Sequence, residues 1–362
     1  MAQEATIEKL RMLPVQLVET GDGVIVKRGC IEINILGEGA VDVVQAVIAA
    51  TAADGATRDE ICELFSAPDR PSVASLIEKL ESRRILVSMA GLDRHDEGIE
   101  PSYDVFLWHF GEQAEQVSRR LAERRITIAG VNYVSRQLAV SLATSGAEQV
   151  EVVDYPTLRN LRLFDASRER MTNQWPSFLK PPRPYEDWKD RFDAETPHCV
   201  VATSDFGGLQ LMREWNHFCV SNKLHFLPVV LQDLIGYVGP LVVPGETACF
   251  ECLRARQNAV MDQPEARRAS EYFAFEQQAV VGFHPSMASI LGDIAAIELT
   301  KLYGIRMPLW RVGTLIEVNL VAMQLKSRKV LKIPRCAVCS PLKTRSSVGL
   351  TTSSFALQQM ER

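Results

Sequence analysis

The sequence lacks both a hydrophobic run long enough to cross a membrane and a strong excess of charge of one sign. Its 40 basic residues stand against 45 acidic ones, a net charge of -5, which leaves no overall field to attract nucleic acid or a membrane surface. The first residues, MAQEATIEKLRMLPVQ, lack the hydrophobic segment of a signal peptide, so we expect a cytoplasmic protein. Partners must therefore be recognised by local surfaces.

Glycine is scarce where a nucleotide-binding chain needs it most. Residues 126–146, ITIAGVNYVSRQLAVSLATSG, have the pattern of a buried strand, a tight turn and a helix, as in dinucleotide- and ATP-binding units. Such turns use glycine so that backbone N–H groups can approach a phosphate. In the frame GxGxxG only Gly130 is present, and Asn132 and Tyr133 would place side chains where phosphate oxygens lie. Asp154 ends the next strand pattern, VEVVD, where an acidic residue either accepts hydrogen bonds from a ribose or simply caps a turn.

Cysteine is limited to eight residues, of which four form two pairs. CFEC contains Cys249 and Cys252, and CAVC contains Cys336 and Cys339. This spacing lets both sulfurs of a turn face one ion, and two such turns complete a closed tetrahedral zinc site. A closed site has no position for water, so we predict a structural zinc that ties the C-terminal segment to the preceding domain. Two independent redox pairs, or coincidence, are the alternatives.

The hydrophobic periodicity divides the chain into four parts. Residues 1–90 show three strand patterns and three helix patterns, which predict a winged-helix-like module, and residues 91–104 are a polar linker. Residues 105–345 alternate strands and helices, which predicts an α/β domain with a mainly parallel sheet. Within it, residues 155–197 lack periodicity and are expected to be largely loop, and residues 346–362 are expected to be a weakly ordered tail. The strands that we expect in the sheet are ITIAGV, VEVVD, HCVVATS, HFLPVVL and GYVGPLVV, with a long helix after His284 and two later strand patterns.

The order of the motifs resembles the ThiF/MoeB superfamily, the ubiquitin-activating-type adenylating enzymes. The degenerate loop, VEVVD, VVATSD, GPLVVPGETACFEC and the final CAVC carry this resemblance over nearly the whole chain. Within the superfamily the chain is most similar to the ThiF-like (Ocin-ThiF-like) proteins of ribosomal-peptide (RiPP) natural-product pathways, which carry an N-terminal RiPP recognition element. The resemblance implies a Rossmann-type fold, a homodimer, and a role in antibiotic or bacteriocin biosynthesis. It also implies two partners, the leader peptide of a precursor and a modifying enzyme such as a YcaO-type azoline-forming cyclodehydratase.

The resemblance also assigns positions in the nucleotide site. Asp154 matches the ribose-binding position, Asn160 begins the Asn-Leu-x-Arg-Gln segment, and Asp205 falls at the magnesium position. The chain departs from this pattern because Arg162 comes one place early, no Gln follows, and no clear Gly-Lys pair is present. We therefore interpret the site of Gly130, Asn132, Asp154, Asn160 and Asp205 as vestigial, with no catalytic residue and no bound ATP. The alternative is an active ATP-dependent enzyme that adenylates or dehydrates a bound precursor peptide, and a regulatory or carrier protein is a third hypothesis.

An exposed strand edge beside a helix can bind an extended peptide by β-augmentation. By resemblance, the third strand and third helix of the N-terminal module form this cleft. The apolar candidates are alternatively core residues, which we expect of about half of them. The strand candidates are Cys30, Ile31, Ile33 and Ile35, the helix candidates are Val73, Leu76, Ile77 and Leu80, and the cations that could pair with an acidic leader are Lys79, Arg83 and Arg84.

Overall fold

A computed structural model describes residues 8–52, 54–89, 102–167, 169, 171–172, 174–260, 265–266, 269, 281–308 and 312–341. The chain divides into two compact units, Met1–Ala114 and Glu115–Arg362. None of the helices within these ranges is long and apolar enough to span a membrane. The expected tail at 346–362 and residues 91–101 of the expected linker lie outside the described residues.

The first unit is built on a three-stranded antiparallel sheet. Its strand order is β2 (Gln16–Thr20), β3 (Gly23–Arg28) and β4 (Ile31–Leu36), so β4 is an edge strand. Helices α1 (Ala40–Ala50), α2 (Arg58–Glu63), α3 (Arg70–Ser82) and α4 (Ser102–Trp108) complete the unit with a second small sheet, in which β1 (Leu10–Met12) pairs with β5 (Leu86–Ser88). Thr57 and Glu60 cap α2 reciprocally, which fixes the start of that helix. The three expected strands and three expected helices are all present.

The third helix is shorter than its apolar pattern predicts. The apolar pattern of residues 71–87, the last of the three helix patterns in residues 1–90, predicts one helix, but α3 ends at Ser82. Arg84 takes a φ of 57°, in the left-handed region that ends a helix. The chain then turns Ile85 and Leu86 into the core, where they are 0% and 1% exposed, and continues as β5. The prediction failed because Ile85 and Leu86 fit the apolar pattern of the helix, although they belong to the turn and the strand that follow it.

The second unit is built on one eight-stranded sheet. Its order is β13-β12-β11-β10-β9-β6-β7-β8, in which β10, β9, β6, β7 and β8 are parallel and β11 to β13 are antiparallel. The chain runs from β6 outward through β7 and β8 and returns to the other side for β9, so the order reverses between β6 and β9. The prediction of a mainly parallel sheet is confirmed. The strands are β6 (Ile126–Ala129), β7 (Val150–Asp154), β8 (Arg183–Pro184), β9 (Cys199–Ser204), β10 (His225–Gln232), β11 (Ile235–Val238), β12 (Thr314–Asn319) and β13 (Gln324–Lys329).

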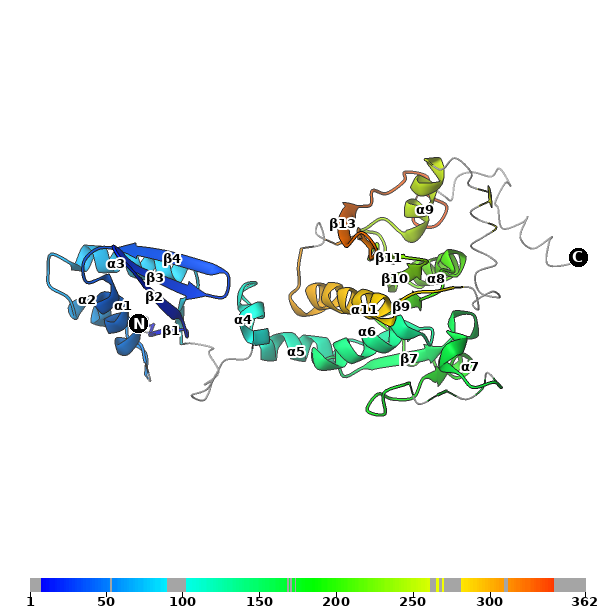
Figure 1. The fold of residues 1–362 in the computed structure, drawn as a ribbon, viewed down its shortest axis with the longest axis horizontal. Helices are drawn as coiled ribbons and strands as arrows, with labels where there is room; N and C mark the ends of the chain where they lie inside the picture. The colour runs from blue at the N-terminus through cyan, green and yellow to red at the C-terminus, as the bar shows by residue number, and fades with distance from the viewer. Residues whose placement is uncertain are drawn as a thin grey trace, which may run out of the picture. The chain divides into compact units, whose positions relative to one another are not determined.

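Helices cover the parallel part of this sheet. The crossovers through α6 (Tyr133–Thr144) and α8 (Leu209–Ser221) leave the reversal point in opposite directions, so the right-handed rule puts these helices on opposite faces. Figure 1 shows α11 (Pro285–Leu299), the expected helix after His284, beside α6. The two pack closely at Gly292, where an added Cβ would lie 2.8 Å from the Leu138 nitrogen. The other helices are α5 (Ala114–Ala122), α7 (Tyr185–Asp190) and α9 (Phe250–Ala259).

Two expectations for this unit need correction. The strand expected over GYVGPLVV stops at Val238, because Gly239 takes a φ of 93° and Pro240 has no N–H to donate to a neighbouring strand. Part of the expected loop at 155–197 is ordered as β8 and α7, and Trp188 of α7 is only 3% exposed. Trp188 packs with Trp215 of α8 at a ring distance of 5.8 Å, a contact that local periodicity does not encode.

Candidate functional site

The four paired cysteines meet at one point of the second unit. Their ligand atoms all lie within 4.8 Å of one another, with Cys249 Sγ 3.6 Å from Cys336 Sγ and Cys252 Sγ 3.5 Å from Cys339 Sγ. A tetrahedral ion with bonds of about 2.3 Å to sulfur requires sulfurs roughly 3.8 Å apart. Three of the four residues are buried. The spacing and the donor atoms therefore fit a single metal ion with four thiolate ligands.

Helix α9 and the chain after β13 position these sulfurs. Cys249 is the residue before α9, and the Phe250 amide that follows it donates to the Asn216 side chain of α8 at 2.9 Å. From the other segment, the Ile333 amide donates to Cys252 Sγ at 3.4 Å. Contact with the neighbouring sulfurs and burial raise the pKa of the Cys249 thiol. A bound cation favours the thiolate form of cysteine. An ion among these closely spaced sulfurs would therefore stabilise the folded chain.

A second polar cluster lies at the carboxyl ends of β6 and β9, where sheets of this kind bind nucleotides. Asp205, which follows β9, is 0% exposed. Its carboxylate accepts hydrogen bonds from the Tyr133 amide at the start of α6 and from Asn160 Nδ2, each at 2.9 Å. Burial raises the pKa of Asp205 to about 6. The helix end that would receive a phosphate is thus capped by a carboxylate of the chain itself.

Asn132 is also committed to internal hydrogen bonds. Its Oδ1 caps α6 by accepting from the Ser135 amide at 2.9 Å, and its Nδ2 donates to the Thr203 carbonyl at 2.9 Å and to the Leu158 carbonyl at 3.2 Å. Asn132 is 0% exposed, so these contacts replace solvent entirely. Gly130 has a φ of 108°, and a Cβ there would come within 2.9 Å of the Thr203 carbonyl oxygen. The one remaining glycine therefore serves close packing of the loop on β9.

The carboxylate of Asp154 pairs with Arg159, a residue that the sequence analysis did not single out. Arg159 donates from Nε to Asp154 Oδ1 at 2.5 Å and from its second amino group to Asp154 Oδ2 at 2.7 Å. The guanidinium also lies over the Phe164 ring, 4.9 Å from its centre. Both oxygens that would face a ribose are used in this bidentate pair. An Arg five residues after the Asp was the available signal, but that spacing alone does not predict an ion pair outside a helix.

The structure separates the expected peptide cleft into buried and accessible residues. Ile33 of β4 and Val73, Ile77 and Leu80 of α3 are 0–3% exposed and form core. Ile31, Ile35 and Leu76 are partly buried at its margin. The accessible members, apart from the edge of β4 itself, are Cys30, Lys79, Arg83 and Arg84.

A thiol and an imidazole meet beside the start of β4, a pair that the sequence analysis did not identify. Cys30 Sγ lies 3.6 Å from His109 Nδ1. The His109 ring packs on Gly29, where a Cβ would approach Nε2 to 2.5 Å. The neighbouring Trp108 donates from Nε1 to the Arg84 carbonyl at 2.8 Å, which fixes the end of α4. Cys30 is exposed.

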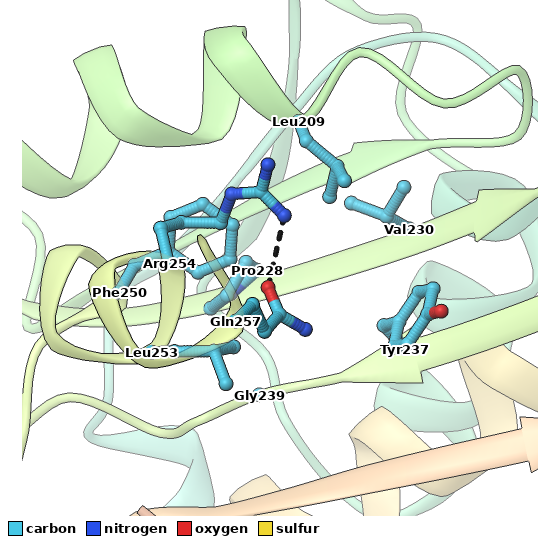
Figure 2. Close-up of a pocket in the computed structure, with 9 residues that line it drawn as sticks. All are labelled: Leu209, Pro228, Val230, Tyr237, Gly239, Phe250, Leu253, Arg254 and Gln257. Carbon is cyan, nitrogen blue, oxygen red and sulfur yellow. Dashed lines mark hydrogen bonds between the residues drawn. The ribbon is translucent and has the colours of Figure 1, made fainter. Parts of the chain in front are cut away.

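A small pocket opens between α9, β10 and β11 (Figure 2). Arg254 of α9 enters it with 4% exposure and donates to Gln257 Oε1 at 2.9 Å, the bond that is dashed in Figure 2. Leu209, Val230 and Tyr237 line the apolar side. The cavity, of about 10 Å³, has room for about one water molecule. It is too small for a cofactor in this conformation.

These observations define a two-unit α/β protein with a mainly parallel sheet and a cluster of four cysteines able to hold a metal ion. At the carboxyl ends of β6, β7 and β9, which we call the nucleotide edge, Asp205, Asn132 and Asp154 bond other groups of the chain. Solved structures share this architecture. E. coli MccB aligns with a TM-score of 0.67 and 17% identity over 92% of this chain and 97% of that one. The microcin C7 biosynthetic enzyme MccB in complex with N-formylated MccA aligns with a TM-score of 0.64 and 17% identity over 92% and 100%.

The heterocyclase TruD aligns with a TM-score of 0.58 and 17% identity over 97% of this chain but only 47% of TruD. No family model and no curated protein matches the chain. At these identities the likeness establishes the fold, which agrees with the ThiF/MoeB-like fold expected from the sequence.

Proposed function

We propose that this chain binds the leader peptide of a ribosomally made precursor and presents it to a separate modifying enzyme, without using ATP itself. Support for the peptide-modification context comes from the similar structures, since MccB is a biosynthetic enzyme solved with MccA and TruD is a heterocyclase. The observation that carries the non-catalytic part is the closed nucleotide edge. The partner we expect is a YcaO-type cyclodehydratase, and we expect the chain to act as a homodimer in the cytoplasm.

The closed edge argues against phosphate chemistry on electrostatic grounds. ATP-dependent acyl activation needs backbone donors and cations directed at the phosphates. Here the Tyr133 amide is taken by Asp205, and Arg159 is taken by Asp154. A triphosphate would have to displace both contacts and lie against two carboxylates. The resulting repulsion and lost hydrogen bonds oppose binding.

The open edge of β4 supports a peptide-binding role for the first unit. β4 pairs only with β3 among the residues that the structure describes, so its outer edge can accept a further strand. Ile31 and Ile35 are partly buried apolar residues of β4 itself, and Leu76 of α3 is partly buried against the core of the same unit. Lys79 of α3 and Arg83 at its end are exposed and would suit acidic side chains of a leader. Backbone pairing would give affinity, and these side chains would give register.

The cysteine cluster then has a structural role, and we propose zinc as its ion. Four thiolates at tetrahedral spacing form a closed site with no coordination position for substrate. The ion would join the start of α9 to the chain after β13.

The leader-binding proposal is tested with candidate precursor peptides, taken from short open reading frames that flank the gene. The N-terminal half of each peptide is labelled with fluorescein, and binding to the full chain is followed by anisotropy. Lys79→Glu with Arg83→Glu is expected to weaken binding about tenfold. Lys189→Glu with Arg191→Glu, on exposed cations near α7, is the matched control and is expected to leave it unchanged. No binding by the wild-type chain would contradict the proposal.

The ATP part is tested separately by calorimetry with Mg-ATP and by pyrophosphate exchange in the presence of the same peptide. Neither binding nor exchange is expected. Exchange would instead establish the alternative, an enzyme that adenylates or dehydrates the peptide. MccB has been solved with ATP, which makes this the relevant comparison.

A further inference from the structure

The last strand of the second unit lies in a segment whose charged side chains are all basic. Residues 318–341 contain five cations and no Asp or Glu, although the whole chain carries a net charge of -5. The five are Lys326, Arg328, Lys329, Lys332 and Arg335. Three of them lie on β13, which is the end strand of the sheet. A basic segment in an acidic protein calls for a local explanation.

β13 is open to solvent along its whole length. All six of its residues are exposed, and within the described ranges it pairs only with β12. Lys326 lies opposite Glu317 in the register, yet neither Lys326 nor Arg328 forms an ion pair with any residue that the structure describes. Their charges are therefore available to a partner. Lys329 and Lys332 differ, since their Nζ atoms donate to the Val312 and Gly245 carbonyls.

Apolar side chains lie among these cations. Val321 is 64% exposed, Met323 80%, Leu325 61% and Leu331 61%. Lysine on an edge strand commonly serves to block pairing with other chains. That purpose does not explain four large apolar side chains exposed within eleven residues, because they favour association. Cations mixed with apolar groups on an unpaired edge instead suit an acidic amphipathic strand.

We propose that the edge of β13 is the docking surface for the modifying enzyme, which adds an acidic extended segment as a further strand. This inference rests on the proposed function, in which the leader peptide occupies the first unit and the enzyme needs a surface of its own. A second copy of the chain fits poorly, because two paired β13 strands would bring six cations together with no acid. Nucleic acid fits poorly as well, because residues 318–341 contain no aromatic residue on which bases could stack.

The test uses the full chain and a purified YcaO-type cyclodehydratase from the same organism, with affinity measured by biolayer interferometry. Lys326→Glu with Arg328→Glu is expected to raise the Kd about tenfold or more and to flatten its salt dependence. Leu325→Asp is expected to weaken binding as well. Lys189→Glu with Arg191→Glu, near the opposite end of the sheet, is the control and should leave the Kd within about twofold. All variants should bind the labelled leader peptide with wild-type affinity.

The outcomes separate this inference from the proposed function. Equal Kd values for the wild type and the Lys326→Glu/Arg328→Glu variant would overturn the docking surface and leave leader binding intact. A wild-type chain that binds the leader but not the enzyme would overturn both the docking surface and the transfer of the peptide. Displacement of the enzyme by a single-stranded oligonucleotide of about 20 nucleotides, with the same loss in the charge variant, would make β13 a general polyanion surface.

Discussion

The cysteine cluster and the polar cluster around Asp205 and Asp154 are both made from residues that distant segments of the second unit bring together. They differ in what the polar groups face: the sulfurs gather around one centre, whereas the carboxylates pair with other groups of the chain. In the cluster, four sulfurs face one central point within 4.8 Å of one another. At the edge, Asp205 faces Asn160 and the α6 amide, and Asp154 faces Arg159. A convergent set needs a ligand to relieve its crowding. In a mutually paired set the polar groups already bond one another, so a ligand would have to compete for them.

The largest effect should come from breaking the convergent set. Cys249→Ser is expected to release about one metal ion per chain and to lower the free energy of unfolding by roughly 4 kcal/mol or more, because metal binding here is folding free energy. Metal content by elemental analysis and thermal unfolding with and without chelator measure this. The control is Cys62→Ser, at a single, partly buried cysteine of the first unit. Full metal content with an unchanged melting temperature would refute the metal site.

The buried carboxylate at the edge predicts an unusual pH dependence. The pKa of Asp205 in the folded chain, about 6, is higher than that of an exposed Asp. The folded state therefore binds this proton more tightly, so the stabilisation is complete at about pH 3 and is lost as the pH rises through 6 to about 7. Relative to Asp205→Asn, the wild type should lose up to about 3 kcal/mol between these limits. Urea unfolding at several pH values tests this, and parallel curves for the two proteins would contradict it.

Asn132 tests whether the edge is held together by its own hydrogen bonds. Asn132→Ala removes the α6 cap and leaves the Thr203 and Leu158 carbonyls without this donor, which should cost about 2–3 kcal/mol. The matched control is Asn222→Ala, an exposed Asn that donates to the Phe218 carbonyl, with an expected change within about 0.5 kcal/mol. Chemical denaturation measures both. Equal losses of unfolding free energy in the two variants would contradict a larger contribution of Asn132 to stability.

The smallest effect is expected at the partly exposed pair of Arg159 and Asp154. Arg159→Ala should cost about 0.5–1 kcal/mol, since the two side chains are 25% and 16% exposed. It should not create ATP binding, because Asp205 still caps α6. Calorimetry with Mg-ATP checks this. Binding by the variant would mean that one arginine alone closes the site, and the contrast between the two clusters would then be much weaker.

Much of the fold could be predicted because its signals are local. The buried apolar runs of β6, β7, β9 and β10 and the capping box at Thr57 lie within a few residues of each other in sequence. β8, α7 and the end of α3 could not be predicted in this way. They depend on long-range contacts such as that between Trp188 and Trp215, or on one left-handed residue, Arg84.

The candidate site also has one part that local sequence signals predict and another that depends on long-range contacts. Cys-x-x-Cys spacing specifies where each pair of sulfurs points, so the assembly of Cys249, Cys252, Cys336 and Cys339 followed from the sequence. The missing glycines predicted a departure from the phosphate-binding loop, but not that Asp205 would accept the hydrogen bond of the Tyr133 amide. That Asp205 would cap α6 depends on how β9 ends beside β6, which is a property of the sheet. Arg159 was missed because nothing local distinguishes it from an ordinary loop arginine.

An ion held by the cysteine cluster would turn part of the chain into a closed ring. Cys249 and Cys336 are 87 residues apart, and α11, β12 and β13 all lie between them. As long as an ion links the sulfurs, a protease cut in the intervening chain would open the ring without separating the two fragments. Removal of the ion would not by itself separate the fragments of a chain cut before α11, because β12 still pairs with β11 and α11 still packs on α6.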